Sequence, residues 1–274
     1  MYGALIGDVA GSRHEFDPLP KSARPEDFTF LTGRCRPTDD SMMTLAVARA
    51  IRLTDGDFEG LAETLIDAMH DIGNRYINAG YGGTFIHWLL QRSRAPYNSF
   101  GNGSAMRVSP AGWAWSTLED TQKGAAITAS VSHNHPYGIT GAKATASAIF
   151  MARTGAAKAE IREYIEREFG YDLSRPLADI QPWYSFDVTC QGSVPEALTA
   201  FLEGGSYEEA VRRAIWLGGD SDTQGCIAGG VAEAMYGVPE DIKQKGLTFF
   251  DDYQRREIDL WAAWLAKRQA AGRA

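Results

Sequence analysis

The amino-acid sequence predicts an all-α fold for this chain of 274 residues. Apolar residues recur at helical spacing in most segments, and capping residues and glycines stand where such helices would begin and end. The alternation of apolar and polar residues that is typical of strands is missing. The stretch 185–189 is compatible with extended backbone, but no other feature builds a sheet. Because prolines and glycines are dispersed, without repeats or low-complexity sequence, we assign a single domain, 1–274.

The first expected helix lies at the N-terminus. Its Gly3, Gly7 and Gly11 recur every four residues, so they line one face and allow another backbone to approach closely. The same segment lacks a basic leader and holds Asp8 in a very short apolar run, which argues against a signal peptide. No stretch approaches the roughly 20 apolar residues that a membrane span requires. We therefore expect a soluble protein with no membrane partner.

The later helices are predicted from capping signals and from periodicity. An S-x-x-E capping box at Ser193 and Glu196, with Pro195 in the first turn, predicts a helix that starts there. Ser206 and Glu209 form a second capping box, which predicts the start of the next helix. Periodicity predicts four more helices, at 41–53, 137–152, 156–168 and 252–269.

The charge and the cysteines of the chain limit its partners. Lys and Arg number 27 against 35 Asp and Glu, which gives a net charge of −8. We expect no nucleic-acid partner, because non-specific phosphate binding needs a basic surface, and an anionic substrate would need local positive potential. The three cysteines, Cys35, Cys190 and Cys226, suggest neither a disulfide framework nor a C-x-x-C zinc site. A reducing cytoplasm fits this composition best.

Two clusters, each with two carboxylates and a hydroxyl, stand directly before predicted helices. They are Thr38, Asp39 and Asp40 before 41–53, and Asp220, Asp222 and Thr223 before 224–236. One such side chain is enough to cap a helix, so N-capping is the simpler explanation for each cluster. Four carboxylates packed together would hold protons tightly unless a cation neutralised them. The first cluster follows the stretch 17–36, which contains three prolines and is expected to be a long loop of the kind that often acts as a lid.

The side chains in both clusters are hard oxygen donors without Cys or His, which favours Mg²⁺ or Mn²⁺ over zinc. Six donors cannot fill two octahedra, so water and substrate would complete a binuclear site. Gly225, Gly229 and Gly230 interrupt the helical run 224–236, where each costs about 1 kcal/mol relative to Ala. Tight helix packing explains these glycines, and the same packing would allow metal-bearing turns to meet.

Two motifs lie between the acidic clusters. Gly101-Asn102-Gly103 can turn successive N–H groups toward one point, as in backbone nests that hold phosphate oxygens, or it can be a plain turn. His133 and His135 occupy an irregular turn before a helical segment. Their i, i+2 spacing does not define a zinc site, so they face either a cleft or solvent.

Five segments, taken together and in this order, resemble the ADP-ribosylglycohydrolase family. They are GALIGDVAGSRHEF at 3–16, TDDSMMTLAVARAI at 38–51, GNGSAMRVSPAG at 101–112, SHNHP at 132–136 and GGDSDTQGCIAGGVAEAMYG at 218–237. The resemblance implies a compact orthogonal bundle of many helices around a central cleft with two divalent cations, Mg²⁺ or Mn²⁺. It also implies metal ligation by all six cluster residues: Thr38, Asp39, Asp40, Asp220, Asp222 and Thr223.

The resemblance implies roles for other residues as well. Glu15 resembles a glutamate on a mobile entrance segment that can reach a metal, although it is otherwise an ordinary surface acid. The expected substrate-binding residues are Ser99, Gly101, Asn102 and Gly103 around the diphosphate, Phe100 against adenine, and His133 in the cleft. Glu15 and Asp39 are the expected catalytic carboxylates, one of which accepts a proton from water and assists the leaving group.

The resemblance implies a metal-dependent hydrolase that removes ADP-ribose from a protein or a small-molecule conjugate through an oxocarbenium-like transition state. A non-catalytic ADP-ribose-binding protein is the alternative from another class, and a general Mg²⁺ phosphohydrolase is a third interpretation. The identity of the product would separate all three. The acceptor, whether arginine, serine, an acetyl ester or another group, is not encoded in these motifs.

Overall fold

The computed structural model describes residues 1–272, and within this range the chain forms fifteen helices and no β-strand. The helices are α1 (Tyr2–Gly11), α2 (Asp39–Leu53), α3 (Leu61–Arg75), α4 (Gly83–Leu90), α5 (Gly103–Met106), α6 (Ser109–Ala114), α7 (Leu118–Ser130), α8 (Pro136–Arg153), α9 (Lys158–Phe169), α10 (Leu177–Ile180), α11 (Cys190–Glu203), α12 (Tyr207–Leu217), α13 (Ser221–Tyr236), α14 (Glu240–Leu247) and α15 (Asp252–Ala270). The prediction of an all-α fold is confirmed.

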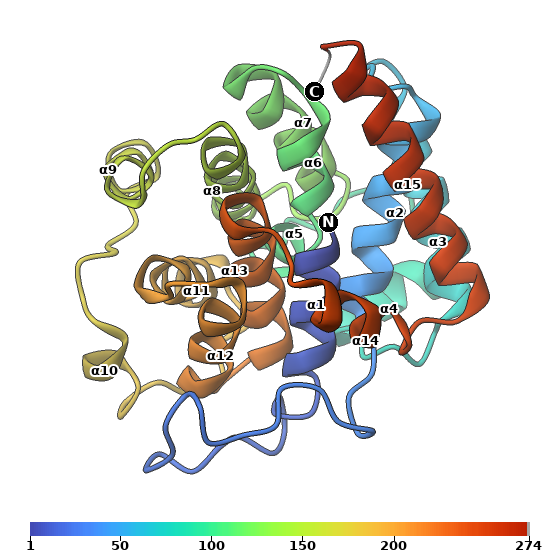
Figure 1. Cartoon of the computed structure of the whole chain (residues 1–274). Helices are drawn as coiled ribbons and strands as arrows, with labels where there is room; N and C mark the ends of the chain where they lie inside the picture. Colours follow the sequence, from blue (N-terminus) through green and yellow to red (C-terminus); the bar gives the residue numbers. More distant parts are fainter. Residues whose placement is uncertain (273–274) are drawn as a thin grey trace.

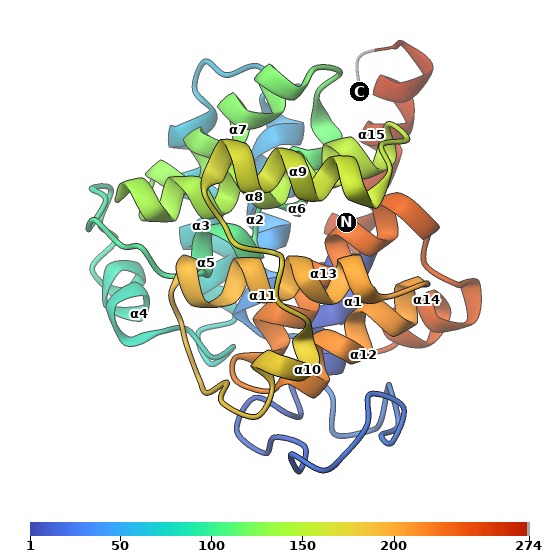
Figure 2. The ribbon, with the colours of Figure 1, turned by 90° about the vertical axis from the view of Figure 1, so that its left-hand side faces the viewer.

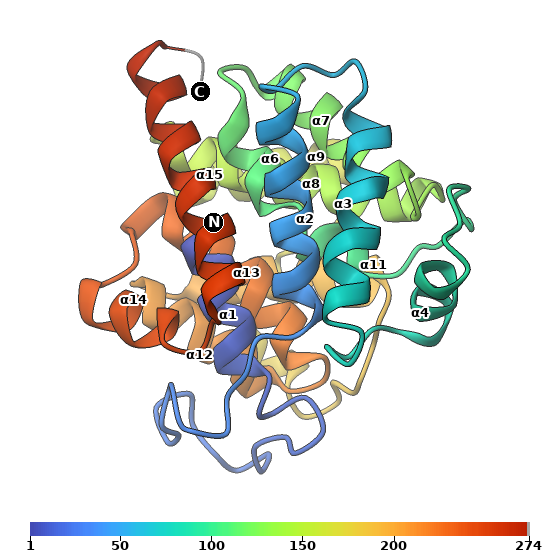
Figure 3. The same ribbon diagram turned by 90° about the vertical axis from the view of Figure 1, so that its right-hand side faces the viewer.

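The helices cross one another at steep angles. In Figure 1, α2, α3 and α15 run upright, whereas α8, α9 and α11 are seen nearly end-on. Figure 2 shows α8, α9 and α11 lying across the view, so this group is roughly perpendicular to the upright helices. Figure 3 shows α2 beside α3, with α4 at the edge of the molecule. The arrangement is the orthogonal bundle that the resemblance implied.

The centre of the bundle is the close contact between α1 and α13. A Cβ atom built on Gly7 would lie 2.0 Å from the carbonyl oxygen of Gly225, and one on Gly3 would lie 2.3 Å from that of Gly229. The glycine stripe of α1 thus packs backbone to backbone against the glycines of α13, which confirms the prediction of tight helix packing. At one end of this contact, Glu233 of α13 accepts hydrogen bonds from the N–H groups of Tyr2 (3.1 Å) and Gly3 (2.8 Å).

Most predicted helix boundaries are close to the observed ones, but one start was wrong. Helix α11 begins at Cys190, and its cap is Thr189, whose side chain accepts a hydrogen bond from the N–H of Gly192. Pro195 therefore lies inside the helix, and Ser193 is not its cap. The start of α12 agrees with the prediction, because the hydroxyl of Ser206 accepts a hydrogen bond from the N–H of Glu209.

The loop expected at 17–36 is present between α1 and α2 and lies below the helices in the view of Figure 1. The possible extended segment 185–189 contributes only an isolated bridge between Gly101 and Thr189 among the described residues. No helix within residues 1–272 is both long and apolar enough to cross a membrane.

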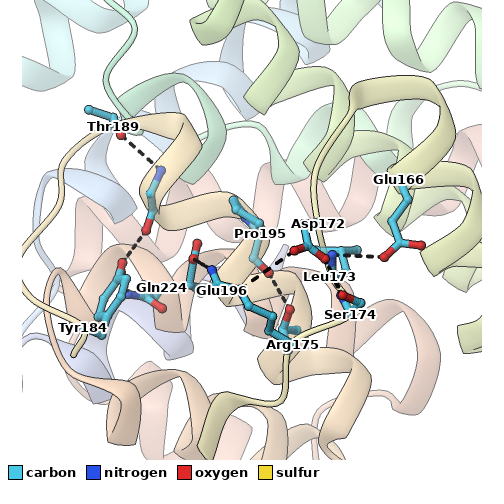
Figure 4. Close-up of polar contacts among 12 residues, drawn as sticks. Glu166, Asp172, Leu173, Ser174, Arg175, Tyr184, Thr189, Pro195, Glu196 and Gln224 are labelled. Carbon is cyan, nitrogen blue, oxygen red and sulfur yellow. Dashed lines mark hydrogen bonds and ion pairs between the residues drawn. The ribbon is translucent and has the colours of Figure 1, made fainter. Parts of the chain in front are cut away.

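Glu196, which was expected to cap a helix, is instead a buried carboxyl group on α11. Figure 4 shows it beside the turn that contains Arg175, whose Nη2 lies 4.0 Å from Glu196 Oε1. Its other oxygen, Oε2, is buried without a hydrogen-bond partner. Burial raises the pKa of Glu196 to about 7, although Arg175 opposes part of the shift.

We expect the Glu196→Gln variant to be more stable than the wild type at pH 8, by about 3 °C or more in Tm. The raised pKa means that folded Glu196 retains a proton that the unfolded chain releases above about pH 4.5. Wild-type stability therefore falls as pH rises from about 4.5 to about 7, and a neutral amide avoids this loss. Thermal unfolding of both proteins at pH 5 and pH 8 measures the difference.

The matched control is Glu168→Gln, which removes the same charge from an exposed position. It should leave the Tm unchanged at both pH values. If the Tm difference between Glu196→Gln and the wild type is no larger at pH 8 than at pH 5, the assignment of a protonated carboxyl group at this site is contradicted.

Candidate active site

Nearly all of the site residues predicted from the sequence line one cavity of about 630 Å³. It lies where the N-terminal ends of α2 and α13 meet the turn before α5. Twelve of the predicted residues line it: Glu15, Asp39, Asp40, Ser99, Phe100, Gly101, Asn102, Gly103, His133, Asp220, Asp222 and Thr223. The thirteenth, Thr38, is buried but is not part of the lining.

The two helix starts that carry the acidic clusters are in direct contact. The hydroxyl of Thr223 in α13 lies 3.3 Å from Asp40 Oδ2 in α2 and donates a hydrogen bond to it. Thr38 is the N-cap of α2, since its Oγ1 accepts a hydrogen bond from the N–H of Asp40. Asp220 occupies the N-cap position of α13 without making a side-chain capping bond. Capping therefore accounts for Thr38 but leaves the carboxylates of both clusters unexplained.

Asp8 of α1 is a fully buried member of this group that sequence reasoning did not select. Its Oδ1 accepts a hydrogen bond from Thr38 Oγ1 (2.7 Å), and its Oδ2 accepts from the N–H groups of Thr38 (3.0 Å) and Ser41 (3.1 Å). The hydroxyl of Ser41 donates to the same oxygen. Because four donors satisfy both oxygens, Asp8 fixes the first turn of α2. Its position next to Gly7 on the glycine stripe was the only sequence signal.

The carboxylates raise one another's pKa values. Burial, followed by the charge of Asp222, raises the pKa of Asp8 to about 7, of Asp39 to about 8 and of Glu15 to about 8. The same two causes raise the pKa values of Asp40 and Asp220 well above the usual range. The cluster therefore strongly favours a neutralising partner, either protons or a cation.

The residues present fit a metal site. Oδ1 of Asp40 and Oδ1 of Asp222 are buried without a hydrogen-bond partner, although buried oxygens normally have one. Ligand atoms of Asp8, Asp40 and Asp222 lie within 4.8 Å of one another, as do those of Glu15, Asp220 and Asp222. Asp222 belongs to both groups, and every donor is a hard carboxylate oxygen of the kind that Mg²⁺ and Mn²⁺ prefer.

Glu15 reaches the cluster from the start of the loop between α1 and α2. It is half-buried, and its carboxyl group lies near those of Asp220 and Asp222. The next residue, Phe16, is 78% exposed and stacks on Phe186, with ring centroids 6.0 Å apart. Both phenylalanines line the cavity, so an aromatic pair from two separate loops borders its mouth.

The Gly101-Asn102-Gly103 turn differs in detail from the expected nest of successive free N–H groups. The N–H of Gly101 is bonded to Ser99 Oγ (3.1 Å), and that of Asn102 is bonded to the carbonyl of Val188 (2.7 Å). Within residues 1–272, the N–H of Gly103 has no acceptor. The Asn102 amide instead donates to Asp220 Oδ2 (2.6 Å), which ties this turn to the acidic cluster.

A buried cation, Arg107, lies behind this turn and borders the cavity. It is 1% exposed, and burial lowers its pKa to about 10. Its Nη2 donates to the carbonyl of Thr128 (2.8 Å) and to Ser132 Oγ (2.9 Å). The sequence motif contained Arg107, but nothing in its spacing indicated a buried positive charge. It supplies the local positive potential that an anionic ligand would need in this acidic protein.

His133 lies at the end of this hydrogen-bond chain. Its Nδ1 is 2.8 Å from Ser132 Oγ, and burial, followed by the charge of Arg107, lowers its pKa well below the usual value. Since Arg107 can only donate, the Ser132 hydroxyl satisfies all groups when it donates to Nδ1. The Nε2 atom then carries the proton of the neutral ring, and it faces Gly103, where an added Cβ would lie 3.0 Å away. His135 lies outside, against the exposed ring of Phe100.

Phe100 also lines the 630 Å³ cavity and is 46% exposed. Gln224, directly after the second acidic cluster, donates to Tyr184 Oη (2.8 Å), a contact visible in Figure 4. Tyr184 Oη in turn donates to the carbonyl of Gly192 in α11. These two hydrogen bonds link the start of α13 to α11 through Tyr184, and they thereby hold the second acidic cluster in position.

The chain matches the family described as ADP-ribosylglycohydrolase over residues 1–273. It is 26% identical to ADP-ribosylhydrolase ARH3 of Mus musculus, over 89% of this chain and 85% of the relative. It is 27% identical to ADP-ribosyl-[dinitrogen reductase] glycohydrolase of Rhodospirillum rubrum, over 93% and 90%. A solved structure described as an ADP-ribosylglycohydrolase-related protein complex has the same fold, with a TM-score of 0.66 at 23% identity over 96% and 93%.

We expect the metal-free protein to lose stability as pH rises from about 4 to about 8. The pKa of Asp8 is raised to about 7 and those of Asp39 and Glu15 to about 8, so the folded state holds protons that the unfolded chain releases near pH 4. Mg²⁺ or Mn²⁺ at about 100 times its Kd should raise the Tm by about 5 °C or more at pH 8.

The increase should be much smaller at pH 5, where protons compete with the metal ion for the carboxylates. Thermal unfolding in EDTA and in each metal salt, with NaCl at matched ionic strength as the control, measures both effects. Equal Tm values with and without divalent ions at pH 8 would show that these carboxylates do not form a metal site.

Proposed function

Because the chain belongs to the ADP-ribosylglycohydrolase family, we propose that it hydrolyses the glycosidic bond between ADP-ribose and an acceptor with the aid of two divalent cations. The observation that carries the proposal is the meeting of two acidic helix starts in one cavity, beside a turn and a buried arginine suited to an anion. The acceptor is a protein side chain or a small molecule.

The proposed metal ligands are the residues of both helix starts: Thr38, Asp39, Asp40, Asp220, Asp222 and Thr223. Asp222 belongs to both groups of converging carboxylates, so we assign it to both ions. Asp8 also converges with Asp40 and Asp222, but its oxygens already accept four hydrogen bonds, so we assign it the role of positioning α2. When bound, Mg²⁺ or Mn²⁺ would stabilise charge on the ribose hydroxyls and lower the pKa of a bound water.

Other residues of the 630 Å³ cavity suit the nucleotide. Phe100 offers an exposed ring face for adenine, as aromatic side chains do in many nucleotide sites. Gly103, Arg107 and His133 line the same cavity, and His133 Nε2 lies close to Gly103. Donors and positive charge there would bind the diphosphate, which overcomes the repulsion expected from a net charge of −8.

The reaction needs one group to take a proton from water and one to help the leaving group. Glu15 and Asp39 are the proposed carboxylates, because both line the cavity that holds the two acidic clusters. Glu15 lies on the loop, next to the exposed Phe16, so it would meet the acceptor side of the anomeric carbon. Positive charge developing at that carbon would be stabilised by the surrounding carboxylates.

We expect Asp222→Ala to reduce kcat/KM at least about a thousandfold, because it removes the ligand shared by both ions. The assay is mass-spectrometric detection of free ADP-ribose from a panel of arginine-, serine- and O-acetyl-linked conjugates, with EDTA as a parallel arm. Asp259→Ala, which removes an exposed acid on α15, should leave the rate unchanged.

Release of AMP or inorganic phosphate would replace the proposal with a phosphohydrolase. Binding of ADP-ribose without any turnover across the panel would replace it with a non-catalytic binding protein. Near-wild-type rates in EDTA would exclude metal dependence.

We expect Asp8→Asn to weaken Mn²⁺ binding by about 10- to 100-fold without abolishing it. The NH2 group of the new asparagine would face the hydrogen-bond donors that Asp8 now accepts from. This donor-to-donor contact would shift the start of α2 and the metal ligands that it carries. Calorimetric titration with Mn²⁺ measures the change. Ser41→Ala, which removes one donor and keeps the carboxylate, should have a smaller effect. Unchanged Mn²⁺ affinity in Asp8→Asn would show that Asp8 does not position the site.

A further inference from the structure

A second cavity, of about 280 Å³, lies next to the first and is rich in arginine. Its lining consists of Ser12, Arg13, Phe16, Asp17, Arg34 and Arg36. Phe16 lines both cavities, so this arginine cavity adjoins the mouth of the proposed active site. Three arginines from two ends of one loop thus gather on a protein whose net charge is −8.

Within the described part of the chain none of the three arginines forms a close ion pair, although the charge of Arg36 acts on the Glu15 carboxyl group at longer range. No carboxylate oxygen lies within 4.0 Å of Arg13, Arg34 or Arg36, even though Asp17 lines the same cavity. The Nε atom of Arg13 is buried without a hydrogen-bond acceptor. A buried guanidinium donor without an acceptor is costly, so an acceptor from a ligand would be favoured at this point.

The backbone of the arginine cavity is held in place. The N–H of Arg36 donates to Ser12 Oγ (3.0 Å), and Ser12 Oγ donates to the carbonyl of Val9 in α1 (2.9 Å). The N–H of Arg34 donates to Thr32 Oγ1 (3.3 Å). The end of the loop that carries Arg36 is therefore tied to α1 through Ser12, next to Arg13.

The position of the arginine cavity indicates which part of a substrate would reach it. Glu15 lies near Asp220 and Asp222, where the distal ribose would bind, and Phe100 of the first cavity is the proposed contact of adenine. Phe16 follows Glu15 directly in the sequence and lines both cavities. An acceptor that leaves the ribose on the Glu15 side would therefore emerge beside the arginine cavity.

We propose that the arginine cavity binds acidic side chains of the ADP-ribosylated protein close to its modified residue, and so selects acceptors with acidic flanks. The inference rests on the proposed function, since it uses the direction in which the acceptor leaves the site. Carboxylates of the bound segment would pair with Arg34 and Arg36 at the rim and with Arg13 deeper in the cavity. The occupant is a protein acceptor rather than the nucleotide, whose diphosphate is assigned to Gly103, Arg107 and His133 of the first cavity.

The test uses peptide pairs that carry one ADP-ribosylated arginine or serine, flanked either by three glutamates or by three glutamines. We expect the wild type to have a higher kcat/KM for the glutamate peptide, mainly through a lower KM. Arg34→Glu should reduce this preference at least about fivefold, because an attraction becomes a repulsion. The preference should also shrink as NaCl rises from about 0.02 to 0.5 M.

The matched control is Arg256→Glu, which makes the same charge change at an exposed position of α15. If general electrostatic steering by net charge were the cause, both variants would change the rates equally. Equal losses in the two variants, or a wild type that does not distinguish the peptides, would overturn the inference.

A binding measurement separates failure of this inference from failure of the proposed function. Fluorescence anisotropy of the same labelled peptides, without added metal ion, reports the preference even when no peptide is cleaved. A preference for glutamate in Kd that Arg34→Glu removes and Arg256→Glu keeps supports the cavity. Cleavage of both peptides at equal rates with equal Kd values supports the enzyme and refutes the cavity.

Discussion

The backbone contact between α1 and α13 is the constraint on which the rest of the structure depends. Gly7 and Gly225 touch through main-chain atoms, and Gly11 approaches the carbonyl of Ser221 so closely that a Cβ atom would lie 2.2 Å from it. Any side chain there would push the helices apart. The contact places Asp8 beside Asp222 and brings the loop that carries Glu15 over the start of α13. Two ends of the sequence thereby build one site.

This contact concentrates several carboxyl groups at buried positions of one site. Asp8 relieves part of this by accepting four hydrogen bonds, whereas Asp40 and Asp222 each keep an oxygen without a partner. Positive charge enters from Arg107, buried behind the turn that precedes α5. A cleft that is lined by both unsatisfied carboxylates and a buried cation suits a ligand that is both anionic and rich in hydroxyl groups.

Much of the fold could be predicted because its signals are local. The capping hydroxyl of Ser206 and the glycine stripes are visible in the sequence itself. The predicted start of α11 was wrong for two reasons. Pro195 is tolerated within the first turns of the helix, and the observed cap, Thr189, has no glutamate three residues later. The roles of Asp8 and Arg107 depend on partners distant in sequence, Thr38 and Ser132, so periodicity carried no information about them. The convergence of the six cluster residues likewise required the tertiary contact of α1 with α13.

The crowded carboxylates have a consequence for how such a protein changes over evolutionary time. Each acid that is neutralised by mutation lowers the repulsion around Asp222, so loss of the chemistry makes the scaffold easier to fold. The backbone contact between α1 and α13 does not depend on those acids, and it would survive their replacement. Descendants without activity but with a robust fold are thus readily accessible, and only continuous selection for turnover keeps so many charges buried in one place.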